Sequence, residues 1–351
     1  MKKTIILSCA IIFFGIHVFS AEADPQNKFT LPFINACGNG DIQSAAFLLK
    51  MGANVNGKLQ NGTTALIAAT MMGRTEIVKL LLSRGADIHV KVGANVTPLA
   101  IACMKGFSEI CQILINKGSD IHNRAFNGIT PLMLASVYGH SDIVKFLINK
   151  GAEVNAKSNQ NENALSMAAN KGHTKVVKIL LENRAEVNVL SDFRVTPIMW
   201  ASKLGFTEIA KLLLAARANP NVTNDKGETP LILASIYNHV DIVKMLIAKG
   251  ADINVKTPNG NTALLGAAIK GNTEILRILL DNGADISAKY SNELTALMLA
   301  AAKGHVEAVK FLLSKGMDVN AKTSTNWTAL SLAVRGQHHA VAELLRAAGG
   351  R

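Results

Sequence analysis

The sequence is poor in aromatic residues, prolines and cysteines. Of its 351 residues, 5% are aromatic, eight are proline and four are cysteine. So little proline excludes a proline-rich chain, and so few aromatic residues argue against one large globular core of the kind found in enzymes of this length. Apolar residues still make up 49% of the sequence, which excludes global disorder.

Acidic residues are also scarce compared with basic ones. The chain has 37 Lys and Arg against 25 Asp and Glu, a formal net charge of +12. This balance favours acidic partners but says nothing about the fold. Beyond the N-terminal segment no apolar run reaches the roughly 20 residues that span a bilayer, so we expect no transmembrane segment in the mature chain.

The first 23 residues have the pattern of a secretory signal peptide. Lys2 and Lys3 precede an almost wholly apolar stretch at 5–19, and Ala21-Glu22-Ala23 is a small-residue cleavage site. An uncleaved anchor is the alternative, although the apolar stretch of about 15 residues is short for a membrane span. We therefore expect cleavage after Ala23 and export, to the periplasm of a bacterium or, as the alternative, to the medium.

The rest of the sequence is dominated by a repeat of 33 residues. Nine equivalent positions carry Thr, or once Asn, followed two residues later by Leu or Ile: Thr64, Thr97, Thr130, Asn163, Thr196, Thr229, Thr262, Thr295 and Thr328. The series has no insertion or deletion, and Leu31-Pro32-Phe33 stands one period earlier as a degenerate copy. A period of this length indicates stacked supersecondary units.

Each copy contains the signals of two short helices. The Thr or Asn is a helix N-cap, and a proline at the next position suits the first helical turn. A glycine such as Gly106 ends this helix, and Ser108-Glu109 begins a second one with an acid near its positive end. Asn-Gly pairs such as Asn61-Gly62 predict hairpin-type turns between copies.

These motifs resemble the ankyrin repeat. The T-P-L triplets are joined by paired alanines and by close matches to two further family motifs, Gly139-His140-Ser141-Asp142 and Gly250-Ala251-Asp252-Ile253-Asn254. The resemblance implies an all-α solenoid of about ten stacked helix-turn-helix repeats with hairpin fingers, and it implies a role in protein binding.

This interpretation divides the chain into three parts. They are the signal peptide at 1–23, a short lead at 24–30 and the repeat array at 31–351. We expect a degenerate N-terminal capping repeat at about 31–58, marked by the polar residues Asn35, Asn39, Asp41 and Gln43. Full repeats should start near residues 59, 92, 125, 158, 191, 224, 257 and 290, and a C-terminal capping repeat should occupy about 323–351.

The sequence departs from the family pattern in two ways. The histidine that usually follows T-P-L is missing, so its hydrogen bonds must be replaced or absent. In addition, Arg184 and Arg217 stand where other copies end the second helix with glycine. A non-glycine residue in a left-handed cap costs roughly 1 kcal/mol, so we expect a softer joint between residues 180 and 225, with a different cap conformation as the alternative.

No constellation of catalytic residues is evident. Five histidines share one repeat position at the turn between helices, which favours turn capping over catalysis: His140, His173, His239, His305 and His338. No phosphate loop, nucleophile elbow or zinc-ligand spacing is present. We expect no enzyme activity, no cofactor and no metal.

Three cysteines remain after residue 23, too few and too odd in number for a disulfide framework: Cys37, Cys103 and Cys111. Cys103 and Cys111 fall on the two helices of one copy, where other copies carry small or apolar residues. This favours buried thiols, with a redox pair as the alternative. Cys37 is too distant to pair with Cys103.

In the resembled family, partners contact the finger tips and the exposed end of the first helix. Large apolar and aromatic side chains occupy those positions here: Met71, Met72, Phe126, Tyr138, Phe193, Tyr237, Tyr290 and Trp327. Such side chains are enriched at binding hot spots. The alternative is that aromatic residues at the tips pack on neighbouring fingers. Trp200 takes a normally apolar place on a first helix and should be packed.

The exposed ends of the first helices also carry cations, without any acid in the same columns: Lys105, Lys171, Lys203, Lys270, Lys303 and Arg335. A row of cations would steer acidic partners, although a merely solvated face is the alternative.

Together these features predict a monomeric, non-enzymatic scaffold that binds an acidic region of another protein on its concave face and finger tips. A secreted effector that binds a host protein is one alternative. A binder of nucleic acid or of an anionic membrane is another, and it predicts steeply salt-dependent, unselective binding. The columns interleave lysines with apolar residues rather than stacking aromatics, so nucleic acid is not the expected partner.

Overall fold

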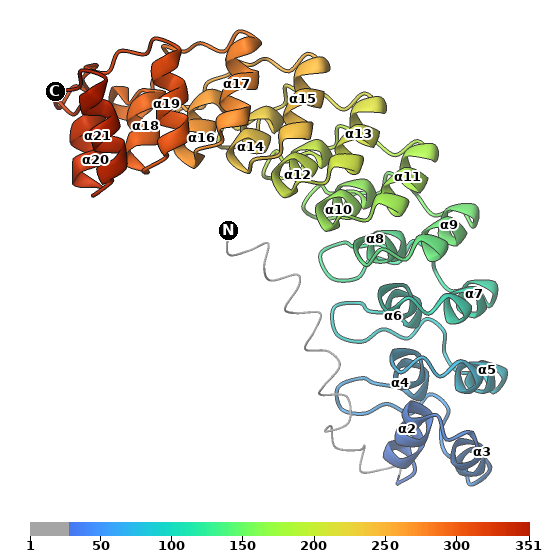
Figure 1. The fold of residues 1–351 in the computed structure, drawn as a ribbon. Helices are drawn as coiled ribbons and strands as arrows, with labels where there is room; N and C mark the ends of the chain where they lie inside the picture. The colour runs from blue at the N-terminus through green and yellow to red at the C-terminus, as the bar shows by residue number, and fades with distance from the viewer. Residues whose placement is uncertain (1–27) are drawn as a thin grey trace. The chain divides into compact units, whose positions relative to one another are not determined.

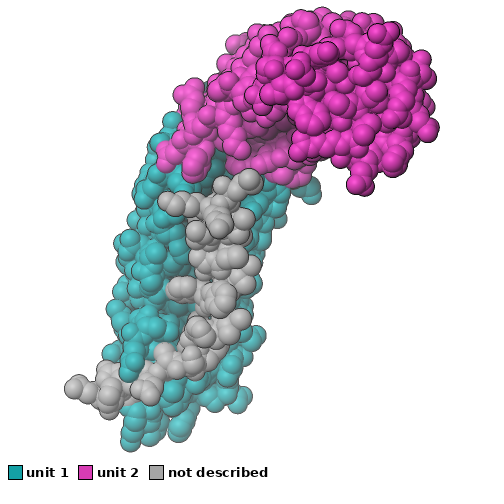
Figure 2. Space-filling view, turned by 90° about the vertical axis from the view of Figure 1, so that its left-hand side faces the viewer, with its two compact units in different colours: residues 1–185 teal, residues 186–351 magenta. Residues whose placement is uncertain are grey.

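The computed structural model describes residues 28–351, so the predicted signal peptide (1–23) and most of the lead (24–30) lie outside the described residues. Within residues 28–351 the helices form ten successive pairs, which confirms the all-α solenoid of about ten repeats (Figure 1). The chain divides after Ala185 into two compact units, which Figure 2 colours separately. Each unit is built in the same way.

Unit 1 contains five helix pairs. Its helices are α2 (Thr30–Asn39), α3 (Ile42–Lys50), α4 (Ala65–Met71), α5 (Thr75–Ser83), α6 (Pro98–Lys105), α7 (Ser108–Asn116), α8 (Pro131–Val137), α9 (Ser141–Asn149), α10 (Ala164–Lys171) and α11 (Thr174–Glu182). The even-numbered helices, the first of each pair, pack against one another, and the odd-numbered helices form a second layer.

Unit 2 contains the remaining five pairs, arranged in the same two layers. Its helices are α12 (Pro197–Leu204), α13 (Thr207–Ala215), α14 (Pro230–Ile236), α15 (Val240–Ala248), α16 (Ala263–Lys270), α17 (Thr273–Asp281), α18 (Ala296–Ala302), α19 (Val306–Ser314), α20 (Ala329–Arg335) and α21 (His339–Ala347). A single 3₁₀ turn, η2 (Ser291–Glu293), lies in the finger before α18.

The repeated Thr and Asn act as N-caps, as the sequence predicts. Thr130, for example, accepts a hydrogen bond from the backbone N–H of Met133 at 3.3 Å, and Asn163 accepts from Ser166 at 2.9 Å. Thr196 is the exception, since its hydroxyl makes no such bond. The N–H of Met199 instead donates to the carbonyl oxygen of Thr196 at 3.1 Å, so the donor that the cap would use is already occupied.

The glycine turns have the left-handed backbone that the repeat pattern requires, for example φ 81° at Gly106. Arg184 and Arg217 adopt the same conformation, with φ of 61° and 65°. The alternative of a different cap at these positions is therefore wrong. The carbonyl oxygens of both arginines accept a hydrogen bond from an asparagine of the preceding loop, at 3.1 Å from Asn155 and 3.3 Å from Asn188.

The fingers between helix pairs contain isolated β-bridges rather than strands in the described part of the chain. Bridges link Val92 with Val96 and Ala125 with Ile129. Neighbouring fingers are joined by backbone hydrogen bonds, such as that from the N–H of Phe126 to the carbonyl oxygen of Ala94 at 2.8 Å. Equivalent bonds run from Asn159 to Asn127 in unit 1 and from Ser291 to Asn259 in unit 2, at 2.8 and 3.1 Å.

The N-terminal capping repeat is less polar than the sequence predicts. Asn39, Asp41 and Gln43 are exposed, as expected of a cap. Three apolar side chains of the same repeat are also exposed: Ile42 (44%), Phe47 (62%) and Met51 (52%). In the described residues no further helix pair precedes the pair α2 and α3, so these side chains are not covered by a neighbouring repeat.

Candidate functional site

At the start of five of the second helices, a histidine side chain is hydrogen-bonded to the preceding repeat. His140 Nε2 lies 3.2 Å from the carbonyl oxygen of Met104, and His305 Nε2 lies 2.9 Å from that of Ile269. Because a carbonyl can only accept, Nε2 must carry the proton in each case. His173, His239 and His338 make the equivalent bond, so this histidine position caps the first helix of the preceding repeat. We call these five histidines the clamp residues and their bonds the clamp bonds.

A second link between repeats was missed at the sequence level. Asn254 Nδ2 donates to the carbonyl oxygen of Gly283 at 3.1 Å, and its Oδ1 accepts from the N–H of Asp285 at 2.8 Å. Asn56 and Asn221 make the same pair of bonds to the following repeat. The recurring Asn of the G-A-D-x-N motif was the available signal, but it gave no indication of the partner.

For each unit we define the inner surface as the predicted binding residues at the exposed ends of the first helices and on the fingers. In unit 1 these residues are Met71, Met72, Lys105, Phe126, Tyr138 and Lys171. Met72, Lys105 and Lys171 are exposed, and the other three are half-buried. Tyr138 stacks on the clamp residue His140 with ring centroids 6.3 Å apart, and burial raises the pKa of its hydroxyl. Tyr138 therefore has a packing role.

The inner surface of unit 2 contains Phe193, Lys203, Tyr237, Lys270, Tyr290, Lys303, Trp327 and Arg335. Phe193 and Tyr237 are the most exposed of its aromatic residues, at 53% and 47%. Tyr290 packs on a neighbouring finger, since its hydroxyl accepts from Asn259 Nδ2 at 3.1 Å. For this residue the structure favours the alternative that tip aromatics contact adjacent fingers.

Two cations of unit 2 lie over indole rings. The Arg335 guanidinium is 5.1 Å from the centre of the Trp327 ring, and Lys203 Nζ is 5.7 Å from that of Trp200. Trp200, which the sequence predicts to be packed, is half-buried, whereas Ile101 and Leu134 at the same repeat position are fully enclosed. The indole is larger than those side chains and reaches the surface, so Trp200 joins the inner surface of unit 2.

The charge environment differs between the inner surfaces and the second helices. Across residues 28–351, none of the six inner cations forms an ion pair: Lys105, Lys171, Lys203, Lys270, Lys303 and Arg335. On the second helices, by contrast, Lys79 contacts Glu76 at 2.7 Å and Glu109 at 2.9 Å, and Lys310 contacts Glu307 at 2.9 Å. The inner cations are therefore available to carboxylates from outside.

A further column of cations lies at the base of the fingers and was not recognised in the sequence. All of its members are exposed: Lys58, Lys91, Arg124, Lys157, Lys256, Lys289 and Lys322. Several have partners within the loops. Arg124 donates to the carbonyl oxygens of Gly128 and Lys157 at 3.2 and 2.7 Å, and Lys256 lies 3.9 Å from Asp285. The signal was a basic residue six positions before seven of the nine N-caps; Thr196 and Thr229 are preceded there by Leu190 and Thr223.

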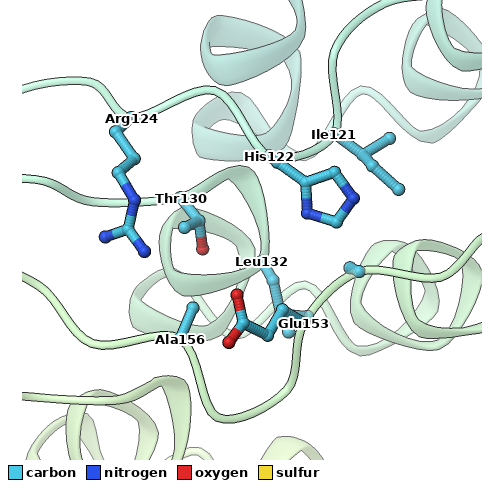
Figure 3. A pocket seen from close by; sticks show the side chains of 8 residues that line it. Ile121, His122, Arg124, Thr130, Leu132, Glu153 and Ala156 are labelled. Atoms are coloured by element: carbon cyan, nitrogen blue, oxygen red, sulfur yellow. The ribbon is translucent and has the colours of Figure 1, made fainter.

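A small cavity opens beside this column in unit 1 (Figure 3). Arg124, Thr130 and Glu153 border it from two successive loops, with Leu132 at one side. Its volume is about 150 Å³. Sites for drug-sized ligands measure roughly 300–1,000 Å³, so this cavity is too small for such a molecule.

The described residues contain neither a metal-binding cluster nor a candidate membrane span. In residues 28–351 no three His, Cys, Asp or Glu side chains are grouped so that they could hold a metal ion. No helix in that range combines the length and apolar character needed to cross a bilayer.

Comparison with known proteins agrees with the repeat architecture. The family model described as ankyrin repeats (3 copies) matches residues 8–92, 89–158, 156–224, 198–290 and 287–350. A search of curated proteins found no match. Since the matched segments cover most of the sequence and the helix pairs follow the same period, the chain belongs to the ankyrin-repeat family.

Proposed function

We propose that this ankyrin-repeat chain is a non-enzymatic scaffold, exported from the cytoplasm, that binds a partner protein through an acidic surface. Ankyrin repeats mediate protein–protein interaction, which supports the general role. The N-terminal sequence pattern supports export, to the periplasm or, as a secreted effector, to the medium. The mechanism is the rigid display of side chains on the inner surfaces.

The unpaired cations are the observation that carries this proposal. Lys105, Lys270 and Lys303 are exposed and have no ion-pair partner, whereas Lys79, Lys244 and Lys310 on the second helices each have a carboxylate partner. A partner's carboxylates can therefore reach the inner cations without displacing an existing pair. Complementary charge of this kind raises association rates and sets the register of docking.

The exposed aromatic residues supply the apolar part of the interface. Phe193, Tyr237 and Trp200 lie in unit 2, on the fingers and first helices of two consecutive repeats, and Lys203 Nζ lies over the Trp200 ring. Tyrosine and tryptophan bury a large area at low cost in side-chain entropy. A partner segment that carries both carboxylates and apolar side chains fits this combination best.

Two matched triple variants test the proposal. The inner variant replaces Lys105, Lys270 and Lys303 by Gln, and the outer variant replaces Lys79, Lys244 and Lys310 by Gln. Both lower the net charge by the same amount. The proteins captured by the wild-type chain from an exported-protein fraction are purified, and their affinities for the three forms are measured. We expect the inner variant to bind at least tenfold more weakly and the outer variant to bind normally.

Equal losses in both variants would show that only net charge matters, and would contradict the proposal. The same assay with single-stranded RNA and with anionic phosphatidylglycerol vesicles separates the remaining candidates. If these bind with a steep salt dependence while no protein is captured, the chain is an anionic-polymer or membrane binder instead. Fractionation of the producing cells distinguishes periplasm from medium, and a chain that stays in the cytoplasm refutes export.

A further inference from the structure

Two thiols meet inside the second full repeat of unit 1. Cys103 lies on α6 and Cys111 on α7, and their Sγ atoms are 3.7 Å apart. Both side chains are completely buried. Cys37, the other cysteine of the described residues, is also buried but has no sulfur contact there. The contact between Cys103 and Cys111 is therefore specific to one repeat.

The repeat geometry explains why the two sulfurs face each other. The same two positions are filled by Ser136 and Val144 in the next repeat, and all four side chains are fully buried. The two cysteines are eight residues apart, and the tight turn at Gly106 reverses the chain between them. A disulfide has its sulfurs about 2.05 Å apart, so closure requires the two sulfurs to approach by about 1.7 Å from their present separation of 3.7 Å.

We propose that Cys103 and Cys111 are joined by a disulfide bond in the exported protein. This inference rests on the proposed export, because disulfides persist in oxidising compartments. The thiolate of one cysteine attacks a disulfide-containing oxidant, such as a thiol–disulfide oxidoreductase or glutathione disulfide, and releases one thiol from it. The second cysteine then attacks the mixed disulfide and releases the other half. The protein loses two electrons and two protons, and the oxidant becomes two thiols.

The bond forms while the chain folds. Once α6 and α7 have closed, neither sulfur is accessible to a dissolved oxidant or reductant. Burial, together with the neighbouring Cys111 sulfur, also raises the pKa of the Cys103 thiol, so little of the reactive thiolate remains. A pair that closes during folding therefore stays closed in the native protein.

The crosslink lies directly beneath the inner surface of unit 1. Cys103 is followed by Met104, whose carbonyl oxygen accepts the clamp bond from His140, and then by the exposed Lys105. A disulfide between α6 and α7 fixes the last turn of α6 on its buried side. It thereby holds Lys105 in place for a partner.

Thiol counting after refolding tests the bond directly. The full-length chain, with four cysteines, is unfolded in a reductant and refolded with either dithiothreitol or a glutathione disulfide buffer. Both samples are then denatured and alkylated with iodoacetamide. In the oxidised sample we expect two labelled cysteines, Cys9 and Cys37, and a linked peptide containing Cys103 and Cys111. Four labelled cysteines, or a link to Cys37, would overturn the proposal.

Substitutions by residues that other repeats of the chain carry at the same positions serve as controls that should fold. Cys103→Ser and Cys111→Val introduce the residues found in the next repeat at these positions, and each should leave its former partner fully labelled. Cys37→Ser should leave the linked peptide unchanged. Protein isolated from the exported fraction must carry the same link, and free Cys103 and Cys111 there would also overturn the inference. A chain absent from that fraction contradicts the proposed export, whereas the refolding result tests the geometry alone.

Discussion

Replacement of His305 by Ala tests whether the side-chain clamps hold neighbouring repeats together. His305 Nε2 donates to the carbonyl oxygen of Ile269 at 2.9 Å, across the boundary between two repeats of unit 2. Its ring also lies against Gly271, where an added Cβ would come within 2.6 Å of the imidazole. The alanine variant removes both the hydrogen bond and the packed ring.

The expected loss follows from these two contacts. A neutral hydrogen bond contributes about 1 kcal/mol net, and a carbonyl left without a partner costs about 1–3 kcal/mol when it is buried. The site is only partly buried, so water can reach the carbonyl oxygen and the lower part of that range applies. We therefore expect His305→Ala to destabilise unit 2 by about 2 kcal/mol.

The chain itself offers two matched controls. Asn272 occupies the same repeat position and donates to the carbonyl oxygen of Ser235 at 2.7 Å, so His305→Asn should restore most of the loss. Phe107, also at this position, packs its ring against Gly73 but has no donor. His305→Phe should therefore lose only the hydrogen bond, and its stability should lie between those of the Ala and Asn variants.

Urea unfolding gives the overall ranking, and native-state amide exchange locates the change. Exchange should accelerate in α16 to α19, because stability in a repeat array depends on neighbouring interfaces. If the Asn variant is as unstable as the Ala variant, or if the Ala variant is as stable as wild type, the hydrogen bond to the preceding repeat is not what holds this joint.

Three further changes probe the core, the caps and the buried thiol. Leu246→Ala should lower the free energy of urea unfolding by about 2–5 kcal/mol, because the side chain is fully buried. Tyr237→Ala, at an exposed site, should change that free energy by no more than about 0.5 kcal/mol and should weaken partner binding. An unfolded Tyr237 variant would show that this ring belongs to the core. Arg217→Gly should stabilise unit 2 by up to about 1 kcal/mol by relieving the left-handed backbone, and a loss of stability would mean that the arginine side chain contributes contacts of its own. Burial raises the pKa of Cys37 from 9.0 to about 12, so the stability that comes from its neutral thiol is complete below pH 9 and is lost as the pH rises towards 12. The melting temperatures of wild type and Cys37→Ala should therefore converge between pH 9 and pH 12. A constant difference between the two melting temperatures over that range would contradict this.

The local elements of the fold could be predicted because their causes lie within a few residues. The N-cap of Thr130 and the turn at Gly106 each depend on neighbours in the same repeat, and both have the expected geometry. The exception at Thr196 is also local, since the capping donor is taken by a backbone carbonyl, but the sequence pattern predicts a cap there as at the other positions.

The contacts between repeats could not be predicted in the same way. Asn254 and its partner Gly283 are 29 residues apart, and His305 and Ile269 are 36 apart. The recurrence of His indicated a role in capping the turn, and the recurrence of Asn was not interpreted; in both cases the partner atoms are backbone groups, which any residue type provides. Side-chain type alone therefore gave no information about where these bonds end.

The same limit applies to the proposed binding surface, because the sequence shows the number of cations but not which of them are paired with carboxylates. Lys79 and Lys105 are both exposed lysines, and the sequence does not show which of them has a carboxylate partner. The structure does, because hydrogen bonds from Lys79 to Glu76 and then Glu109 raise the pKa of that amine to about 12, while Lys105 has no carboxylate partner in residues 28–351. An incoming carboxylate must compete with two others at Lys79 and with none at Lys105. If the proposed partner is acidic, its carboxylates therefore gain more at Lys105 than at Lys79, even though both residues are the same kind of cation.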